Sequence, residues 1–390
     1  MKNKEIKGSI KTKLLTGVLV IELVITLVFI GIFIFSFRQN LQVEAENSVK
    51  KTQGVYDIIM KNDTKMLSAA LDTFATNEPI RQIFATHQDR DQLYTAVEDT
   101  FRSNRERYGI THLYFIDFDG TCFLRVHKKE QFGDIINRQT FVKAKKTDAT
   151  ASGIELGKNV FALRVVAPYF HQGIQIGFLE FGEEIEHFDA IVKKETGVDI
   201  AVVVEKKFLK EADYRAGKKG SGKPDDWDDL KDVVIVSSTI ADRQLIAAQA
   251  VKPEVLAVAG SVFLGTILDE QKTLAQGAFP LKDASGQQVG AVITLHDVTA
   301  QTANERKALT TLLLSALMVF SITFLAAMKY LQSQVIAPIV NLSNEAIAIS
   351  IGNVERKLES ARTDEIGFLI RSFDRMRISL KKSLSLLKKQ

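Results

Sequence analysis

Two long apolar stretches dominate the pattern of hydrophobic and polar positions along the chain. They cover residues 14–37 and residues 308–328. Each is long enough to cross about 30 Å of hydrocarbon as an α-helix. We therefore predict transmembrane helices at residues 14–37 and 308–330, with residues 1–13 forming a short segment before the first.

The segment after the first apolar stretch has a helical pattern. Between residues 39 and 75 the apolar positions mostly recur at spacings of three, four and seven, which places them on one face of a helix. Pro79 cannot continue the hydrogen-bond ladder, so we expect the helix to end near Asn77 and Glu78. A shorter helix is predicted at residues 89–108.

The pattern then changes from helical spacing to alternation. Residues 113–118 and 122–127 are predicted to form a hairpin around Asp119-Gly120, a dipeptide that favours tight turns. The other expected elements are a helix at residues 139–146 and strands at residues 160–168 and 175–181. Together they predict a small antiparallel sheet within residues 38–182.

A second unit with a similar order of elements is predicted at residues 183–307. It begins with an amphipathic helix that Gly197 ends. The expected strands lie at residues 199–205 and 233–238 and in a hairpin within residues 277–299 that turns at Ser285-Gly286. Residues 217–230 are rich in Gly, Lys and Asp, and we interpret them as a solvated loop.

Residues 331–390 carry two runs of apolar residues with heptad spacing. The runs are Val335, Ile339, Leu342, Ala346 and Ile349, and then Ile366, Leu369, Phe373, Met376 and Leu380. Pro338 stands near the start of the first run, Gly352 follows it, and the sequence Asp-Glu-Ile-Gly occupies residues 364–367. This combination resembles a HAMP domain.

The resemblance to HAMP implies a parallel four-helix bundle built by a homodimer. It implies signalling roles for residues at the matching positions: Pro338, Leu342, Glu365, Gly367 and Phe373. In such a bundle two alternative packings of the helices carry the signal.

The region between the apolar stretches resembles a double Cache sensor. The resemblance rests on residues 112–134, residues 163–182 and the hairpin at residues 279–299. It implies an α+β extracytoplasmic domain with two PAS-like antiparallel sheets on a long N-terminal helix. The membrane-distal unit would be residues 38–182 and the membrane-proximal unit residues 183–307. Bacterial chemoreceptors, sensor kinases and cyclases carry such domains.

Basic residues predict the orientation of the two spans. Lys2, Lys4, Lys7, Lys11 and Lys13 precede the first, and Lys329, Arg356 and Lys357 follow the second. Both termini are therefore expected in the cytoplasm, with the sensor on the other side of a bacterial inner membrane. A cleaved signal peptide is the alternative; against it, the first stretch is longer than a signal peptide's apolar region.

Candidate ligand contacts follow from strand alternation in the first unit. Alternation places Phe123, Arg125 and His127 on one face of their strand, and Arg164 on a face of a later strand. Two guanidinium groups directed at one cavity suit a carboxylate, with His127 and Tyr114 orienting it. The competing interpretation is that these arginines pair with local acids such as Glu155 or Glu180.

The sequence offers no catalytic constellation. Its six histidines form no HExxH motif, and there is no P-loop and no GxSxG motif. The single cysteine, Cys122, excludes an internal disulfide, and the net charge of +4 gives no case for nucleic acid. We interpret Asp225, Asp226, Asp228 and Asp229 as part of a solvated loop rather than a cation site, and expect no cofactor and no metal.

The predicted function is that of a transmembrane receptor, not an enzyme. A small-molecule ligand outside would bias the HAMP bundle inside, and a kinase, phosphatase or cyclase supplied by another chain would give the output. After HAMP the sequence shows no output module, so it is interpreted either as a separate input unit or as a shortened chain. A ligand-independent membrane scaffold whose tail recruits a kinase or phosphatase is the alternative, and an extracytoplasmic enzyme is the least supported hypothesis.

Overall fold

The computed structural model describes residues 10–87, 89–156, 161–220 and 222–387. The chain divides into two compact units. One is formed by residues 39–302, and the other contains the residues up to 38 together with residues 303–390.

The helices at the start of the chain end where the sequence predicts. Helix α1 (Ile10–Ala75) runs without a break from the first apolar stretch into the sensor unit, and α2 (Glu78–Thr86) and α3 (Arg90–Tyr108) follow. The side chain of Asn77 accepts a hydrogen bond from the backbone N–H of Ile80 at 3.2 Å, so it caps the N-terminus of α2. Pro79 occupies the first turn, where it has no intrahelical hydrogen bond to lose.

The first sheet has five antiparallel strands in the order β2-β1-β5-β4-β3. Its elements are β1 (His112–Ile116), β2 (Cys122–Arg125), the 3₁₀ turn η1 (Val126–Lys128), α4 (Gln139–Thr147), β3 (Ala151–Leu156), β4 (Phe161–His171) and β5 (Ile174–Glu184). The predicted hairpin, helix and later strands are confirmed. The expected end of the second strand is wrong, because β2 stops at Arg125 and His127 lies in the 3₁₀ turn.

The second sheet repeats this topology, with the order β7-β6-β10-β9-β8. Its strands are β6 (Asp199–Glu205), β7 (Val233–Ser238), β8 (Val262–Asp269), β9 (Lys272–Lys282) and β10 (Gln288–Asp297). Its helical elements are α5 (Glu186–Thr196), η2 (Lys206–Phe208), α6 (Glu211–Gly220), α7 (Arg243–Ala250) and α8 (Pro253–Leu256). The sequence pattern does not predict α6, α7, α8 or β8, because these elements are short and lack a clear apolar period.

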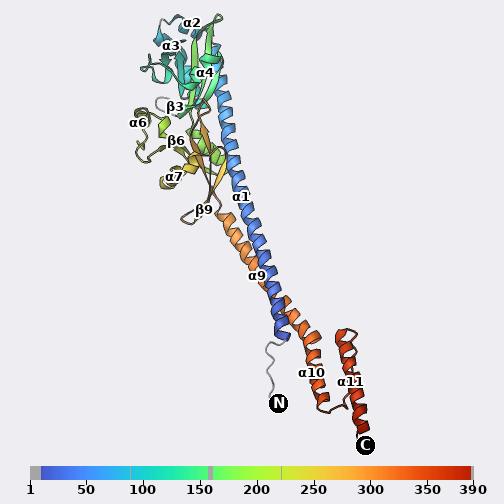
Figure 1. Ribbon diagram of the computed structural model, residues 1–390. Helices are drawn as coiled ribbons and strands as arrows, with labels where there is room; N and C mark the ends of the chain where they lie inside the picture. The colour runs from blue at the N-terminus through green and yellow to red at the C-terminus, as the bar shows by residue number, and fades with distance from the viewer. Residues whose placement is uncertain (1–9, 88, 157–160, 221, 388–390) are drawn as a thin grey trace. The chain divides into compact units, whose positions relative to one another are not determined.

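One hydrophobic core joins the two sheets through α1, which passes along both of them (Figure 1). The ring of Tyr56 on α1 packs edge-on against Phe188 and Phe279, with ring centroids 5.6 and 5.7 Å apart. Further along α1, Phe74 makes the same kind of contact with Phe181 of β5 at 5.4 Å. Because α1 is shared, the two sheets and this helix form a single packed unit.

The polar stretch at residues 217–230 is not simply a solvated loop. Trp227 is buried in the main core, and its ring lies 5.3 Å from that of Tyr214. The Asp226 carboxylate is also buried, and it accepts a hydrogen bond from the Tyr214 hydroxyl at 2.8 Å and pairs with Arg243. The stretch is partly buried because Tyr214 and Arg243 of α7, which lie outside it, supply the polar partners of Asp226.

The other unit contains α9 (Thr299–Leu331) from residue 303 on, a π-helical turn η3 (Gln332–Ile336), α10 (Ala337–Ser350) and α11 (Glu365–Leu387). By length and composition, the helices Thr12–Ala75 and Thr299–Ser350 are apolar enough to include a membrane span. The sensor unit's last strand, β10, is separated from α9 by Val298 alone. The second apolar helix therefore begins directly at the end of a central strand.

The connector between α10 and α11 explains why the tail has its Pro and Gly. Pro338 has no N–H for the carbonyl of Gln334, and that oxygen accepts a hydrogen bond from Arg362 Nη2 at 2.9 Å instead. Asp364 pairs with Arg362 at 2.6 Å and accepts from the N–H of Gly367 at 2.9 Å, so it caps α11. At Gly367 a Cβ would come within 2.2 Å of the Arg362 carbonyl oxygen, so only Gly fits.

The heptad residues of the tail differ in burial. Leu342 and Ile349 are buried between α10 and α11, and Phe373 is half-buried. Glu365 is exposed at the start of α11. Leu369, Met376 and Leu380 lie exposed on α11, although they belong to the same heptad row as Phe373. The single chain therefore leaves part of the row uncovered.

Candidate functional site

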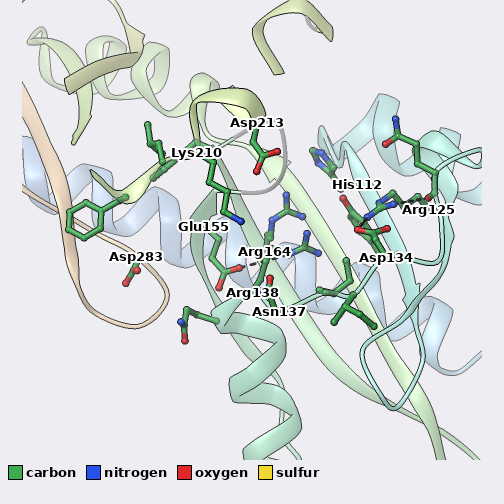
Figure 2. Close-up of a pocket in the computed structure, with 18 of the residues that line it drawn as sticks. His112, Arg125, Asp134, Asn137, Arg138, Glu155, Arg164, Lys210, Asp213 and Asp283 are labelled. Atoms are coloured by element: carbon green, nitrogen blue, oxygen red, sulfur yellow. Dashed lines mark hydrogen bonds and ion pairs between the residues drawn. The ribbon is translucent and has the colours of Figure 1, made fainter. Parts of the chain in front are cut away.

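A cavity of about 650 Å³ opens on one face of the first sheet. β1, β2, β4, α4 and residues 126–138 form most of its wall, and η2, residues 209–213 and the turn after β9 close it from the second sheet. Figure 2 shows Arg164 and Arg138 side by side at its centre, with Lys210 and Asp213 approaching from the opposite wall. Tyr114, Arg125, His127 and Arg164, four of the five predicted ligand contacts, line this cavity.

The centre of the cavity holds two arginines that share one buried glutamate. Arg164 on β4 is 1% exposed and donates from Nη1 to Glu180 Oε1 at 2.5 Å. Arg138, just before α4, donates from Nη2 to the same carboxylate. Burial alone would favour a protonated Glu180, but the charges of Arg138 and Arg164 outweigh it and hold the pKa of Glu180 below its usual value. Glu180 is thus an ionised partner for both arginines.

Both guanidinium groups keep a buried donor unused. The Nε atoms of Arg138 and Arg164 have no hydrogen-bond partner among the residues that the structure describes. The Arg138 Nε lies 3.9 Å from the nearer oxygen of Glu155, too far for a hydrogen bond. Since buried polar groups normally have partners, these donors mark the place where an acceptor is missing.

Glu155 on β3 stands beside the arginines in a different electrostatic state. Its carboxylate accepts hydrogen bonds from the backbone N–H and the hydroxyl of Thr140 at the start of α4. Burial raises its pKa to about 7, against the lowering effects of the Thr140 N–H and of Arg138. Near neutral pH Glu155 therefore contributes less than a full negative charge to the cavity.

Tyr114 and two histidines form the aromatic side of the cavity. The guanidinium carbons of Arg125, Arg138 and Arg164 lie 5.2, 4.9 and 5.8 Å from the centroid of the Tyr114 ring. The rings of His112 and His127 are 4.6 Å apart, and that of His127 is 4.9 Å from Tyr114. Burial first, and then Arg164, lower the pKa of His127 to about 3 and that of His112 well below its usual value, so both rings are neutral.

Arg125 is anchored by neighbours from the loop after η1. It donates to Asp134 Oδ2 at 2.7 Å and to the carbonyl oxygen of Gln131 at 2.8 Å. Arg125 and Arg164 thus both have the local acidic partners that the competing interpretation foresees, although for Arg125 that partner is Asp134. Their pairing leaves both side chains on the wall of the cavity.

Phe123 does not share the face of Arg125, and that expectation is wrong. Phe115 pairs with Leu124, and the next residue of β1, Ile116, pairs with Cys122, so Phe123 is the extra residue of a β-bulge. Its ring packs against Phe84 of α2 at a centroid distance of 5.5 Å, on the other side of the sheet. The bulge breaks the alternation on which the prediction depended.

Several cavity residues escape prediction from the sequence. Arg138 follows no strand or motif, and its partner Glu180 is 42 positions away. His112 precedes the predicted strand by one residue, and Lys210 belongs to the other sheet's unit. Apart from the basic residues of the cavity, no local sequence signal indicates its lining. The lining is assembled from segments that only the fold brings together.

A family profile described as the double sensory domain of two-component sensor kinases matches residues 42–302, and a HAMP profile matches residues 330–382. The chain belongs to the double Cache family. Its α+β sensor is followed by a HAMP domain, and two apolar helices flank the sensor. These domains indicate a signalling role as in receptors that bind small ligands, and they include no evident catalytic domain.

Sensor domains among the solved structures are similar to this chain at low identity. The sensory domain of the Campylobacter jejuni chemoreceptor Tlp3 with isoleucine bound is 11% identical over 67% of this chain and 94% of its own, with a TM-score of 0.40. The sensor domain of the V. cholerae histidine kinase DctB is 10% identical over 66% of this chain and 98% of its own, with a TM-score of 0.39.

The E. coli DcuS sensor domain is 19% identical over 36% of this chain and 98% of its own, with a TM-score of 0.30. At these scores the likeness does not extend to ligands. A comparison with curated proteins found no match.

Proposed function

We propose that this chain is a two-pass receptor of a bacterial inner membrane that senses a small molecule with a carboxylate group. The observation that supports the ligand class is the centre of the cavity, where two buried arginines share one ionised glutamate and each keeps an unpaired Nε donor. A ligand carboxylate would accept from these donors and balance the second positive charge. Such charge-assisted bonds are among the strongest that proteins make.

The size and polarity of the cavity fit a small ligand. Its volume of about 650 Å³ lies within the range of typical ligand pockets. Tyr114, Arg125, His127 and Arg164 are the proposed contacts, together with Arg138 and Lys210. Phe123 is no longer proposed, because it faces the core.

Binding of carboxylates can be tested on the full-length chain in detergent. Organic acids and amino acids are screened for a rise in melting temperature, each beside its neutral amide. We expect an acid to stabilise the protein and its amide to have little effect. If no acid shifts the melting temperature, the ligand-independent scaffold is favoured instead.

A matched pair of lysine variants tests the site itself. Lys210 lines the cavity, whereas Lys207 on the same segment pairs with Glu205 at 2.6 Å and is not among the lining residues. Lys210→Met should weaken binding of the acid by about tenfold, since a hydrogen bond to a charged group contributes about 1.5–3 kcal/mol. Lys207→Met should leave it unchanged, and equal effects of the two substitutions would remove Lys210 from the site.

The proposed orientation places both termini in the cytoplasm. Ser285 in the turn between β9 and β10 and Ser383 on α11 are exposed, and the native Cys122 is buried. A thiol reagent that cannot enter cells should therefore label Ser285→Cys and spare Ser383→Cys in intact cells. Equal labelling of the two variants would contradict the two-pass topology.

The proposed relay runs from β10 through α9 and the π-helical turn to a HAMP bundle formed with a second copy of the chain. The exposed residues Leu369, Met376 and Leu380 on α11 supply the apolar seam that a parallel bundle needs. Ligand would bias two packings of this bundle, to the extent that it binds one state more tightly. A kinase, phosphatase or cyclase on another chain would receive the signal.

Truncating the heptad residues Leu342 and Phe373 separates binding from relay. Leu342→Ala and Phe373→Ala should each abolish the ligand-dependent change in cross-linking between cysteines placed on α11 of the two copies. The melting-temperature shift caused by the ligand should persist, because the cavity lies in the other compact unit. Unchanged cross-linking in both variants would contradict a relay through this bundle.

A further inference from the structure

Away from the cavity, three potential metal ligands meet where α1 passes the junction of β5 and α5. They are Asp63 on α1, Glu183 near the end of β5 and His187 in the first turn of α5. One ligand atom from each lies within 4.8 Å of the other two. None of these residues belongs to the cavity lining.

The hydrogen bonds of His187 fix which ring nitrogen faces the cluster. Its Nδ1 lies 2.9 Å from the carbonyl oxygen of Glu184, which can only accept, so Nδ1 carries the hydrogen. In the neutral ring Nε2 is then a bare acceptor, and it lies 3.0 Å from Oδ2 of Asp63. Two acceptors at that distance need a proton or a metal cation between them. A backbone carbonyl on the second nitrogen is the usual support of a metal-ligating histidine.

Glu183 supplies the independent sign of a missing ligand. The residue is 1% exposed, and its Oε1 has no hydrogen-bond partner among the described residues. A buried carboxylate oxygen without a donor is costly unless the group takes up a proton or a cation lies against it. Because this carboxylate is part of the same cluster as Asp63 and His187, one ion would satisfy all three groups.

We propose that Asp63, Glu183 and His187 bind a divalent transition-metal ion, with Zn²⁺ as the best match. One imidazole and two carboxylates form a donor set that suits Zn²⁺ and its neighbours, whereas Mg²⁺ and Ca²⁺ prefer oxygen ligands alone. Three protein ligands leave a fourth tetrahedral position for water. The ligands come from α1, β5 and α5, so the ion would hold the long helix against the sensor.

The proposed metal site lies on β5, the strand that also carries Glu180 of the cavity. Glu183 follows Glu180 on β5 by three residues, and Glu180 is the carboxylate shared by the two cavity arginines. Asp63 lies on the helix that continues into the first apolar stretch. An ion here would therefore clamp the membrane-connected helix to the strand that carries the centre of the cavity.

Metal titration of the full-length chain, without a purification tag and stripped with chelator, tests the site. We expect one Zn²⁺ per chain, a raised melting temperature, and visible absorption bands when Co²⁺ is used instead. Mg²⁺ should give no comparable stabilisation. Glu183→Gln and His187→Asn should each lower the affinity for Zn²⁺ by at least about tenfold, since even supporting residues of metal sites have effects of this size.

His87 provides the matched control. Its Nε2 pairs with Asp117 Oδ1 at 2.6 Å, as His187 pairs with Asp63, but no third ligand completes a cluster there among the described residues. His87→Asn should leave Zn²⁺ binding unchanged, and Asn tolerates the positive φ of 49° at this position. The His187 side chain is 44% exposed, so its variant should fold even if Glu183→Gln does not.

Two results would overturn the proposal. One is a Zn²⁺ affinity that His187→Asn and Glu183→Gln leave the same as in the unaltered chain. The other is the absence of saturable binding, which would assign the cluster to a protonated His187 paired with Asp63. Both readouts are independent of the carboxylate ligand, so they do not depend on the function proposed above.

Discussion

The two sheets of the sensor share one topology but carry opposite chemistry on their outer faces. Their strand orders, β2-β1-β5-β4-β3 and β7-β6-β10-β9-β8, correspond strand for strand. On the first sheet Arg164 and Glu180 occupy the outer faces of β4 and β5, and a cavity lies over them. On the second, Ala278 of β9 and Ala291 and Ile293 of β10 occupy that face as part of a closed apolar cluster.

What covers each sheet explains the difference. The apolar side chains Ile246 of α7 and Val255 of α8 pack directly on the second sheet as part of one buried apolar cluster. The first sheet is covered by α4 and a long irregular loop, whose charged residues pair with the sheet across the gap (Figure 2). The comparison teaches that this fold forms a cavity where its cover is polar and irregular, and an ordinary core where the cover is an apolar helix.

The largest change in stability that tests this contrast is expected from Glu180→Gln. The substitution keeps the shape of the side chain but removes the negative charge that Arg138 and Arg164 share. Removing one member of a buried ion pair costs about 3–5 kcal/mol. Denaturant unfolding of the full-length chain in detergent, followed by the fluorescence of Trp227, measures the loss.

The double variant Arg164→Met/Glu180→Met is the control for an electrostatic cause. It removes one charge of each sign and should recover part of the stability, because apolar replacement of a buried pair is often neutral. If Glu180→Gln is as stable as the unaltered chain, the charges of the first sheet are not coupled as described.

A smaller loss of stability, with ligand binding unchanged, is expected from Ile246→Ala. This residue belongs to the cover of the second sheet, so its truncation leaves a void in an apolar cluster. The expected loss of stability is about 2–4 kcal/mol. Ligand affinity, measured by calorimetry below the melting temperature, should be unchanged because the residue does not line the cavity. A changed affinity would break the distinction between the two faces.

The smallest predicted effect concerns pH and Glu155. Burial raises its pKa from 4.5 to about 7, so between these values the folded chain keeps a proton that the unfolded chain releases. Stability from this group is therefore lost as pH rises through that window, by at most about 1.4 kcal/mol per unit. Of its charged neighbours, Arg138 stays protonated, and Glu180 stays ionised across most of the window.

Glu155→Gln should remove this contribution. Relative to the unaltered chain, the variant should be more stable at pH 8 than at pH 5, by up to about 2.5 kcal/mol. Melting temperatures of both proteins at the two pH values give the difference, in which titration of other buried acids cancels. A difference that does not vary with pH would show that Glu155 is ionised throughout.

The sequence predicts the parts of this fold whose signals are local. Pro79 ends the long helix, Asp119-Gly120 turns the first hairpin, and the alternation before residue 299 gives the last one. Strands β3 and β8 were not predictable in the same way, because their stability comes from neighbours. Gly153 of β3, for example, lies so close to the turn after β9 that a Cβ on it would approach the Cβ of Ala284 to 2.5 Å.

The candidate site residues likewise divide into those that a local pattern predicts and those that only long-range packing brings together. Strand alternation brings Arg125 and Arg164 to one cavity, but it fails at Phe123 because a bulge shifts the register by one residue. Arg138 joins Glu180 only through packing of α4, and His187 meets Asp63 across 124 positions. Long-range pairings of this kind leave no periodic trace in a single sequence.

By itself, then, the sequence determined that two apolar helices flank a sensor with two similar sheets and that a HAMP helix pair follows. These features follow from hydrophobic period and from turn and cap residues, which act over a few positions. Only the tertiary structure decided which sheet has a cavity, which arginines share Glu180, and that Asp63, Glu183 and His187 converge. The physical reason is that a buried charge is tolerated only where distant segments supply its partners, and only the folded chain fixes which segments meet.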